Sequence, residues 1–245
     1  MMNALRSEIT KLTSVRSTWI YLVLLTGALY GPVVLLGMLG EAGNGPARGW
    51  SSLLQGAQIF QMIAIIMAGS WVGSDIKHNM NAHAFLTQPR RSNWLVAKMF
   101  VVGLFTFLAF VVGCALAWVA ATVVGIDVDA GEGLGYLTTT AIGFPLWAVA
   151  TVGLAALVRS QVAAISLPLV WILVLEPLIN MGAGSVSAIR PLAMILPNST
   201  MVNVAYDNAI FEHASLGATG IIVLIAWLGT LITIGLWANT SRDVR

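Results

Sequence analysis

The chain has 245 residues, of which 58% are hydrophobic and only 9% are charged, and its formal net charge is +2. About a quarter of the residues in a typical soluble domain are charged, so this composition excludes an ordinary soluble globule. Cys114 is the single cysteine, which excludes a disulfide framework and a thiolate metal site. The composition therefore predicts an all-α polytopic membrane protein.

Residues 1–17 have the spacing of a short amphipathic helix. Apolar residues recur at helical intervals with charged residues between them: Met2, Leu5, Ile9, Leu12 and Val15 against Arg6, Glu8 and Lys11. This pattern is typical of a helix that lies in the membrane interface. We predict an interfacial helix here; the alternative is an ordinary charged flank of the first span.

Six stretches are long and apolar enough to cross a bilayer, which needs roughly 20 apolar residues per helix. The predicted spans are residues 18–40, 53–74, 95–125, 134–158, 161–181 and 215–240. A tight turn at Arg159–Gln161 joins the fourth span to the fifth, so these two helices are predicted to be antiparallel neighbours. The whole chain, residues 1–245, then forms one transmembrane domain.

The positive charges predict the orientation of these spans. Ten of the twelve Lys and Arg residues lie on one side: Arg6, Lys11, Arg16, Lys77, Arg90, Arg91, Lys98, Arg159, Arg242 and Arg245. The loops on the other side carry only Arg48 and Arg190. Since cytoplasmic loops carry an excess of Lys and Arg, we expect a multi-pass protein of the cell membrane with both termini in the cytoplasm.

The outer segment, residues 182–214, contains the partly apolar stretch SAIRPLAMILPNST with two prolines. A loop exposed to water would not need this apolarity. We therefore predict short helices that dip back towards the membrane between the fifth and sixth spans.

Few residues offer chemistry. His78 and His83 are five residues apart, which is not the spacing of a pair of zinc ligands on one helix face, and no metal site is expected. There is no Walker-type phosphate loop, and we find no nucleophile with a neighbouring base in the spans. Hence the chain is not expected to be an enzyme or to bind a cofactor itself. Its basic residues follow from topology, so no nucleic-acid partner is expected.

Glu176 is the one acid inside a predicted span, in WILVLEPLIN. An ionisable residue in the membrane is costly unless it faces protein or water, which suggests a role in a substrate path or outer gate. Its position beside Pro177, near the end of the helix, is equally compatible with a structural role. Gln55, Gln58 and Gln61 enter the second span on one polar stripe, and they either line an aqueous path, for which Gln58 and Gln61 are the candidates, or bond across helices.

Residues 73–98, GSDIKHNMNAHAFLTQPRRSNWLVAK, form the most polar stretch of the chain. Asp75 can cap the N-terminus of a helix over Ile76–Phe85, and Pro89 cannot continue it. The chain has no ATP-binding motif of its own. A six-span protein of this kind that presents one cytoplasmic helix is expected to be driven by a partner protein through that helix.

This arrangement resembles the ABC-2-type permeases, the export class related to the ABCG fold, along essentially the whole chain. SEITKLTSVRSTWIYL resembles their opening segment, and residues 73–98 resemble their loop pattern of Gly-x-acid, Leu-Thr-x-Pro-x-Arg and Ala-Lys. WILVLEPLIN followed by ILPNST resembles the fifth span and outer segment of actinobacterial members. This chain has Asn79-Met80-Asn81 where many members have a Gly-Thr pair, so its cytoplasmic helix is expected to begin differently from theirs.

The resemblance implies an exporter of a hydrophobic or amphipathic substrate, such as a drug, an antibiotic, a peptide or a lipid-like molecule. Two such chains, identical or paired with a sister permease, would assemble with two ATP-binding subunits that hold ATP and Mg. It also implies that the loop helix sits in a groove of the ATPase, with contacts from Asp75, Ile76, Lys77, Met80, His83, Phe85 and Arg90. Secondary contacts would come from Glu8, Lys11 and Arg16 on the interfacial helix.

Two other functions stay open. An ion-coupled secondary transporter would need broken helices and buried charges at the bilayer midplane, for which Glu176 and scattered Gly and Pro are the available signals. A passive anchoring subunit is the second. A neighbouring gene for an ATPase with Walker motifs would favour the permease.

Overall fold

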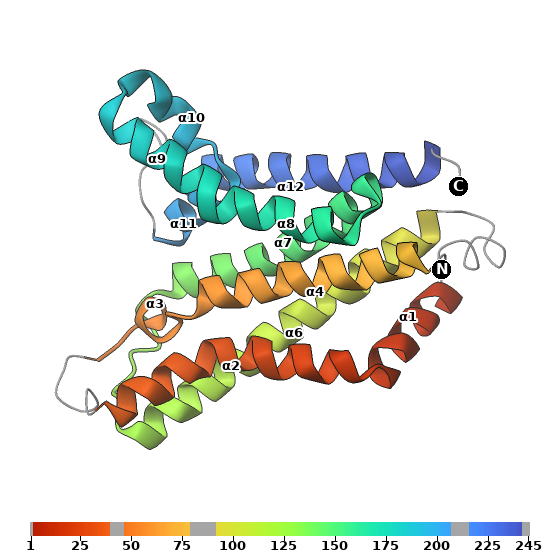
Figure 1. Cartoon of the computed structure of the whole chain (residues 1–245). Coiled ribbons are helices and arrows are strands. Elements are labelled where there is room, and N and C mark those ends of the chain that lie inside the picture. Colours follow the sequence, from red (N-terminus) through yellow and green to blue (C-terminus); the bar gives the residue numbers. More distant parts are fainter. Residues whose placement is uncertain (1, 40–46, 79–91, 207–215, 242–245) are drawn as a thin grey trace.

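The computed structural model describes residues 2–39, 47–78, 92–206 and 216–241, and Figure 1 shows that they form a bundle of helices. Six helices are long and apolar enough to cross a membrane, as predicted. Five of these are α2 (Arg16–Met38), α4 (Ala57–Lys77), α6 (Ser92–Val124), α7 (Leu134–Val158) and α12 (Leu216–Ser241). The fifth in chain order consists of three consecutive pieces, α8 (Gln161–Val170), η1 (Trp171–Leu175) and α9 (Glu176–Ser185).

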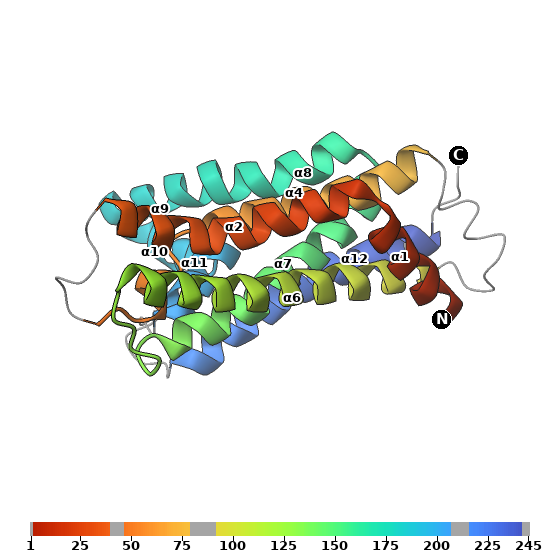
Figure 2. The same ribbon diagram turned by 90° about the horizontal axis from the view of Figure 1, so that it is seen from below.

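Shorter helices lie at the two ends of the bundle. The first thirteen described residues form α1 (Met2–Ser14), which turns into α2 at the extended residue Val15. At the opposite end of the bundle lie α3 (Trp50–Leu53), η2 (Ser187–Ile189), α10 (Arg190–Met194) and α11 (Pro197–Ala205). In Figures 1 and 2, α1 lies at the end of the bundle where α4 and α12 finish and α6 begins.

The core lies between α4, α6 and α7. Phe60, Phe110 and Phe144 come from these three helices and pack with ring centroids 5.5 to 5.8 Å apart. All three rings are almost completely buried. α7 also contacts α12, where Gly153 faces Gly235: a Cβ on Gly235 would lie 2.5 Å from Gly153 Cα. Small residues allow this close approach, which is how helices commonly pack inside membranes.

The fifth span contains a π-helical stretch, Trp171–Leu175, between Pro168 and Pro177. Each proline lacks an N–H, so the regular bonding of the helix is interrupted on both sides of this stretch. A single π turn is the usual local solution to such an interruption. It places Glu176 directly after the irregular turn, with 1% of its surface exposed.

The outer segment folds into short helices, as its prolines and apolar residues predict. α11 packs against α7 and α12, and its residues Met201 and Ala205 are buried, as is Leu196 directly before the helix. Pro197 occupies the first turn of α11, where a missing N–H has no cost. Residues 207–214 of this predicted segment lie outside the described residues.

Candidate functional site

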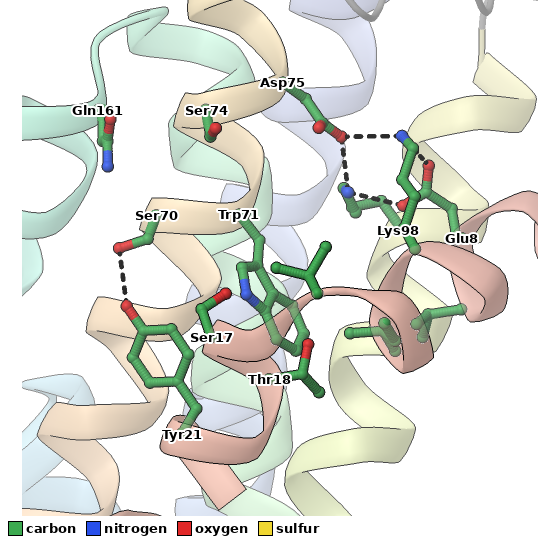
Figure 3. Close-up of a pocket in the computed structure, with 14 residues that line it drawn as sticks. Glu8, Ser17, Thr18, Tyr21, Ser70, Trp71, Ser74, Asp75, Lys98 and Gln161 are labelled. Carbon is green, nitrogen blue, oxygen red and sulfur yellow. Dashed lines mark hydrogen bonds and ion pairs between the residues drawn. The ribbon is translucent and has the colours of Figure 1, made fainter.

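Four charged side chains meet where α1 contacts the last turn of α4 and the second turn of α6 (Figure 3). Lys98 Nζ lies 2.6 Å from Glu8 Oε2 and 2.6 Å from Asp75 Oδ2. Lys11 Nζ lies 2.9 Å from Glu8 Oε1 and 3.4 Å from Asp75 Oδ2. Each carboxylate thus contacts both lysines, and the four charges cancel. We call these four residues the ion cluster.

The ion cluster is largely removed from solvent. The side chains of Lys98, Glu8 and Asp75 are 6%, 4% and 10% exposed, while that of Lys11 is 34% exposed. Moving a charged side chain out of water costs several kcal/mol, and only close pairing with opposite charges offsets that cost. The cluster therefore holds together as a unit: any one charge is tolerated there because the other three are present.

Lys11 is held in its charged form. Burial by itself would lower its pKa, but the hydrogen bond to Glu8 and the charges of Asp75 and Glu8 outweigh burial and raise the pKa above the ordinary value of 10.5. Because the pKa of Lys11 is higher in the folded chain, its charge stabilises the fold at every pH below the ordinary pKa. This stabilisation is lost as the pH rises through the raised pKa. Lys11 is therefore charged throughout the neutral pH range.

The face of α1 that carries the cluster is not its most apolar face. Ala4 and Glu8, four residues apart, are both buried where α1 packs on α6. Ile9 and Val15, which belong to the predicted apolar stripe, are 49% and 47% exposed. The helix predicted over residues 1–17 is therefore present as α1. It packs on the bundle through Ala4 and Glu8, with Leu5 and Leu12 half-buried and Ile9 exposed.

One prediction about the polar loop is wrong. Asp75 does not cap a new helix: α4 runs without a break through Asp75 and Ile76 to Lys77, and its C-cap is His78. The apolar α4 helix simply continues, and the carboxylate of Asp75 bonds to Lys11 and Lys98 instead of to backbone N–H groups. The prediction used only the residues next to Asp75, whereas its partners Lys11 and Lys98 lie 64 and 23 positions away in the chain.

The remaining predicted contact residues are spread more widely. Ile76 is partly buried against the core, while Lys77 and Arg16 are exposed near the ion cluster. Met80, His83, Phe85 and Arg90 lie outside the described residues. The structure thus brings together Glu8, Lys11 and Asp75 of the predicted set and adds Lys98. The signal for Lys98 was a lysine that directly follows the apolar Trp94–Ala97 run at the start of a span.

A polar cavity of about 430 Å³ adjoins the ion cluster. Its walls come from α1, the first two turns of α2, the last two turns of α4, the second and third turns of α6 and the first residue of α8, Gln161. Hydroxyl groups are frequent in its lining: Ser17, Thr18, Tyr21, Ser70 and Ser74. The cavity therefore presents hydroxyl and charged groups beside apolar side chains.

At the opposite end of the bundle Glu176 accepts four hydrogen bonds. Its carboxylate oxygens lie 2.9 Å from Asn198 N, 2.8 Å from Ser199 N, 2.9 Å from Ser199 Oγ and 2.8 Å from Trp171 Nε1. Asn198 and Ser199 are in the first turn of α11, whose backbone N–H groups lack partners within the helix. Glu176 therefore caps α11 from the neighbouring span, and the negative charge suits the positive end of that helix.

The other predicted path residues do not share this environment. Pro177 and Gln58 are exposed, whereas Gln61 is buried and its Nε2 has no hydrogen-bond partner in the described structure. These two glutamines of the predicted stripe thus have different surroundings. Trp171 was not predicted to take part; its only signal was an indole five residues before the buried acid.

Among the described residues there is no group of three or more His, Cys, Asp or Glu side chains that could hold a metal ion. No protein-family model, curated protein or solved structure matches the chain.

Proposed function

We propose that the chain is the membrane-spanning permease subunit of an ATP-driven exporter of the ABC-2 class, set in the cell membrane with both termini in the cytoplasm. Two permease chains, identical or sister chains, assemble with two ATP-binding subunits, which hold the ATP and Mg. The cargo is hydrophobic or amphipathic: a drug, an antibiotic, a peptide or a lipid-like molecule. Six apolar helices and the distribution of positive charge support this assignment.

The observation that carries the proposal is the ion cluster. Its members Asp75 and Lys98 lie on the two helices that flank residues 79–91, and Glu8 and Lys11 lie on α1. A force applied to the loop between α4 and α6 would thus reach α1 and two spans together, because paired buried charges resist separation. This is the mechanical property that a subunit driven from outside requires. Lys77, Met80, His83, Phe85 and Arg90 would contact the ATPase, whereas Asp75 is buried in the ion cluster and Ile76 is partly buried against the core, so these two would act from behind that surface.

The position of α1 fits the membrane interface. Ile9 of α1 is 49% exposed, and Val15 and Trp19 at the start of α2 are 47% and 62% exposed, so apolar and aromatic side chains lie on the outer surface where α1 joins α2. Such residues are stable against acyl chains and headgroups rather than in water. The packing of α11 onto α7 and α12 similarly fits an outer segment that dips back towards the membrane.

The orientation can be tested with single cysteines. In a Cys114→Ala background, Ala130→Cys and Ser241→Cys place one exposed thiol at each end of the bundle. We expect a membrane-impermeant maleimide to label Ala130→Cys in intact cells and Ser241→Cys only after permeabilisation. Labelling of Ser241→Cys in intact cells would contradict the proposed orientation.

The transport activity can be tested in the native membrane. We expect the purified chain to carry a second subunit with Walker motifs and vanadate-sensitive ATP hydrolysis, and inverted vesicles to accumulate a hydrophobic dye when ATP is supplied. The variant Met80→Asp with Lys77→Glu should lose the ATPase subunit, because it alters the proposed contact surface. Arg48→Glu, at the other end of the bundle, is the matched control and should retain it.

The alternative, an ion-coupled transporter, predicts a different result in the same vesicles. Dye accumulation would then follow an imposed ion gradient after ATP has been removed. Glu176 is the acid that the sequence suggested for such coupling, but its four accepted hydrogen bonds already occupy the carboxylate. This geometry favours the permease over the ion-coupled transporter.

A further inference from the structure

We propose that the polar cavity beside the ion cluster binds the phosphate group of a membrane phospholipid. The inference requires that the six helices cross a bilayer, but it does not depend on transport or on an ATPase. The volume of the cavity, about 430 Å³, lies within the roughly 300–1,000 Å³ typical of small-molecule sites. The chemistry of the walls identifies the group that it takes.

Thr18 is the first reason to expect a ligand. The residue is 7% exposed and lines the cavity, yet its Oγ1 has no hydrogen-bond partner in the described structure. A hydroxyl on a helix commonly bonds to the carbonyl of the preceding turn, as Thr26 Oγ1 does with Leu22 O. A buried polar atom left without a partner is costly, so a ligand that bonds to it gains affinity.

The helix α2 begins at the cavity, which makes it favourable for an anion, and Ser17 and Thr18 belong to its first turn. Gln161, the first residue of α8, also lines the cavity, but Ser160 Oγ already caps that helix by accepting from Ala163 N. Val15, the N-cap of α2, has no side chain that can accept from the free N–H groups of this turn. Helix N-termini carry partial positive charge and unpaired N–H donors, and phosphate binds to both.

The nearby charges do not oppose an anion. Glu8 and Asp75 line the cavity, but each contacts two lysine nitrogens within 3.4 Å, and the ion cluster has no net charge. The ammonium group of Lys11 has three donors, of which these carboxylates accept two, and its side chain is 34% exposed. Lys11 therefore retains a donor that a phosphate oxygen can accept.

The rest of the lining identifies the source of the phosphate as a lipid. Leu12, Val15, Trp71 and Val101 add apolar surface to the same cavity. The cavity also lies at the ends of the spans, beside a helix with exposed apolar residues, at the depth where headgroups lie in a bilayer. A small soluble phosphate would use the hydroxyls and Lys11 but leave this apolar surface uncovered.

Binding can be measured by native mass spectrometry of the delipidated full chain, with phosphatidylglycerol and diacylglycerol added separately. We expect phosphatidylglycerol to bind at least about tenfold more tightly than diacylglycerol, which lacks phosphate, since one hydrogen bond to a charged acceptor contributes that much. Glycerol 3-phosphate should compete only weakly. Equal binding of the two lipids would overturn the proposal, and equal binding of glycerol 3-phosphate and phosphatidylglycerol would overturn the lipid source.

Variants then locate the site. Thr18→Val with Ser74→Ala removes two lining hydroxyls with almost no change in volume and should weaken phosphatidylglycerol binding about tenfold or more. Thr122→Val, an exposed threonine at the far end of α6, is the matched control and should leave it unchanged. Thr18→Ser in place of Thr18→Val keeps a hydroxyl and should restore binding. Unchanged binding in the double variant would place the lipid elsewhere.

Discussion

Replacing Lys98 by methionine should lower the free energy of unfolding by about 3–5 kcal/mol, the usual cost of removing one partner from a buried ion pair. Lys98 contacts both Glu8 and Asp75 at 2.6 Å, and its side chain is only 6% exposed. The variant would leave two carboxylates for Lys11 alone. For a chain of this size the loss corresponds to a fall in Tm of roughly 10 °C, measured by heating the purified protein in one detergent.

Two comparisons make this result specific to the ion cluster. Lys77→Met removes an exposed lysine from the last turn of α4 and should change the stability by no more than about 0.5 kcal/mol. Lys98→Met combined with Glu8→Gln leaves Asp75 paired with Lys11 and should be more stable than Lys98→Met alone. A single Lys98→Met variant as stable as the unaltered chain would show that the buried charges do not hold α1 in place.

The second large effect is expected for Glu176→Gln. Two donors point at each oxygen of the carboxylate, whereas an amide offers one acceptor oxygen and turns its own N–H₂ towards the two donors of the other. Losing about two hydrogen bonds to a charged acceptor should cost roughly 2–4 kcal/mol. The backbone amides of Asn198 and Ser199 should also exchange with deuterium faster, because the N-terminus of α11 loses its cap.

This experiment separates the two roles of Glu176 that the sequence left open. A structural cap predicts lower stability and faster amide exchange in α11. A gate predicts impaired transport with the stability and the exchange unchanged. Glu132→Gln, an exposed acid at the same end of the bundle, is the control and should have no effect in either assay.

Hydropathy was sufficient to predict the spans, because each must be long and apolar by itself. The second span begins at Ala57 rather than at residue 53, and the fifth extends to Ser185 rather than to residue 181. In the first case residues 50–53 form a separate short helix, and in the second the π turn and Pro177 continue the helix instead of ending it. Local apolarity therefore predicts that a span exists better than where it ends.

The ion cluster could not be predicted in the same way, since Glu8 and Lys98 are 90 positions apart in the chain. One signal was present: Glu8 lies four residues after Ala4 and four before Leu12, on a stripe that packs against the bundle. A charge on a packed stripe indicates a buried partner of opposite sign, but not which one. The role predicted for Asp75 was wrong for a similar reason: its partners Lys11 and Lys98 are distant in sequence, so the local pattern suggested only a helix cap.

The central claim is that an ATPase moves α1, α4 and α6 as one unit, and distances between spin labels on the co-purified complex test it directly. In a Cys114→Ala background, labels at Thr10→Cys and Ser74→Cys, an exposed position in the last turn of α4, should give one narrow distance that is the same before and after ATP with vanadate. Labels at Thr10→Cys and Ser241→Cys should give a distance that shifts. A Thr10–Ser74 distance that changes with nucleotide, or a Thr10–Ser241 distance that does not, would contradict the claim.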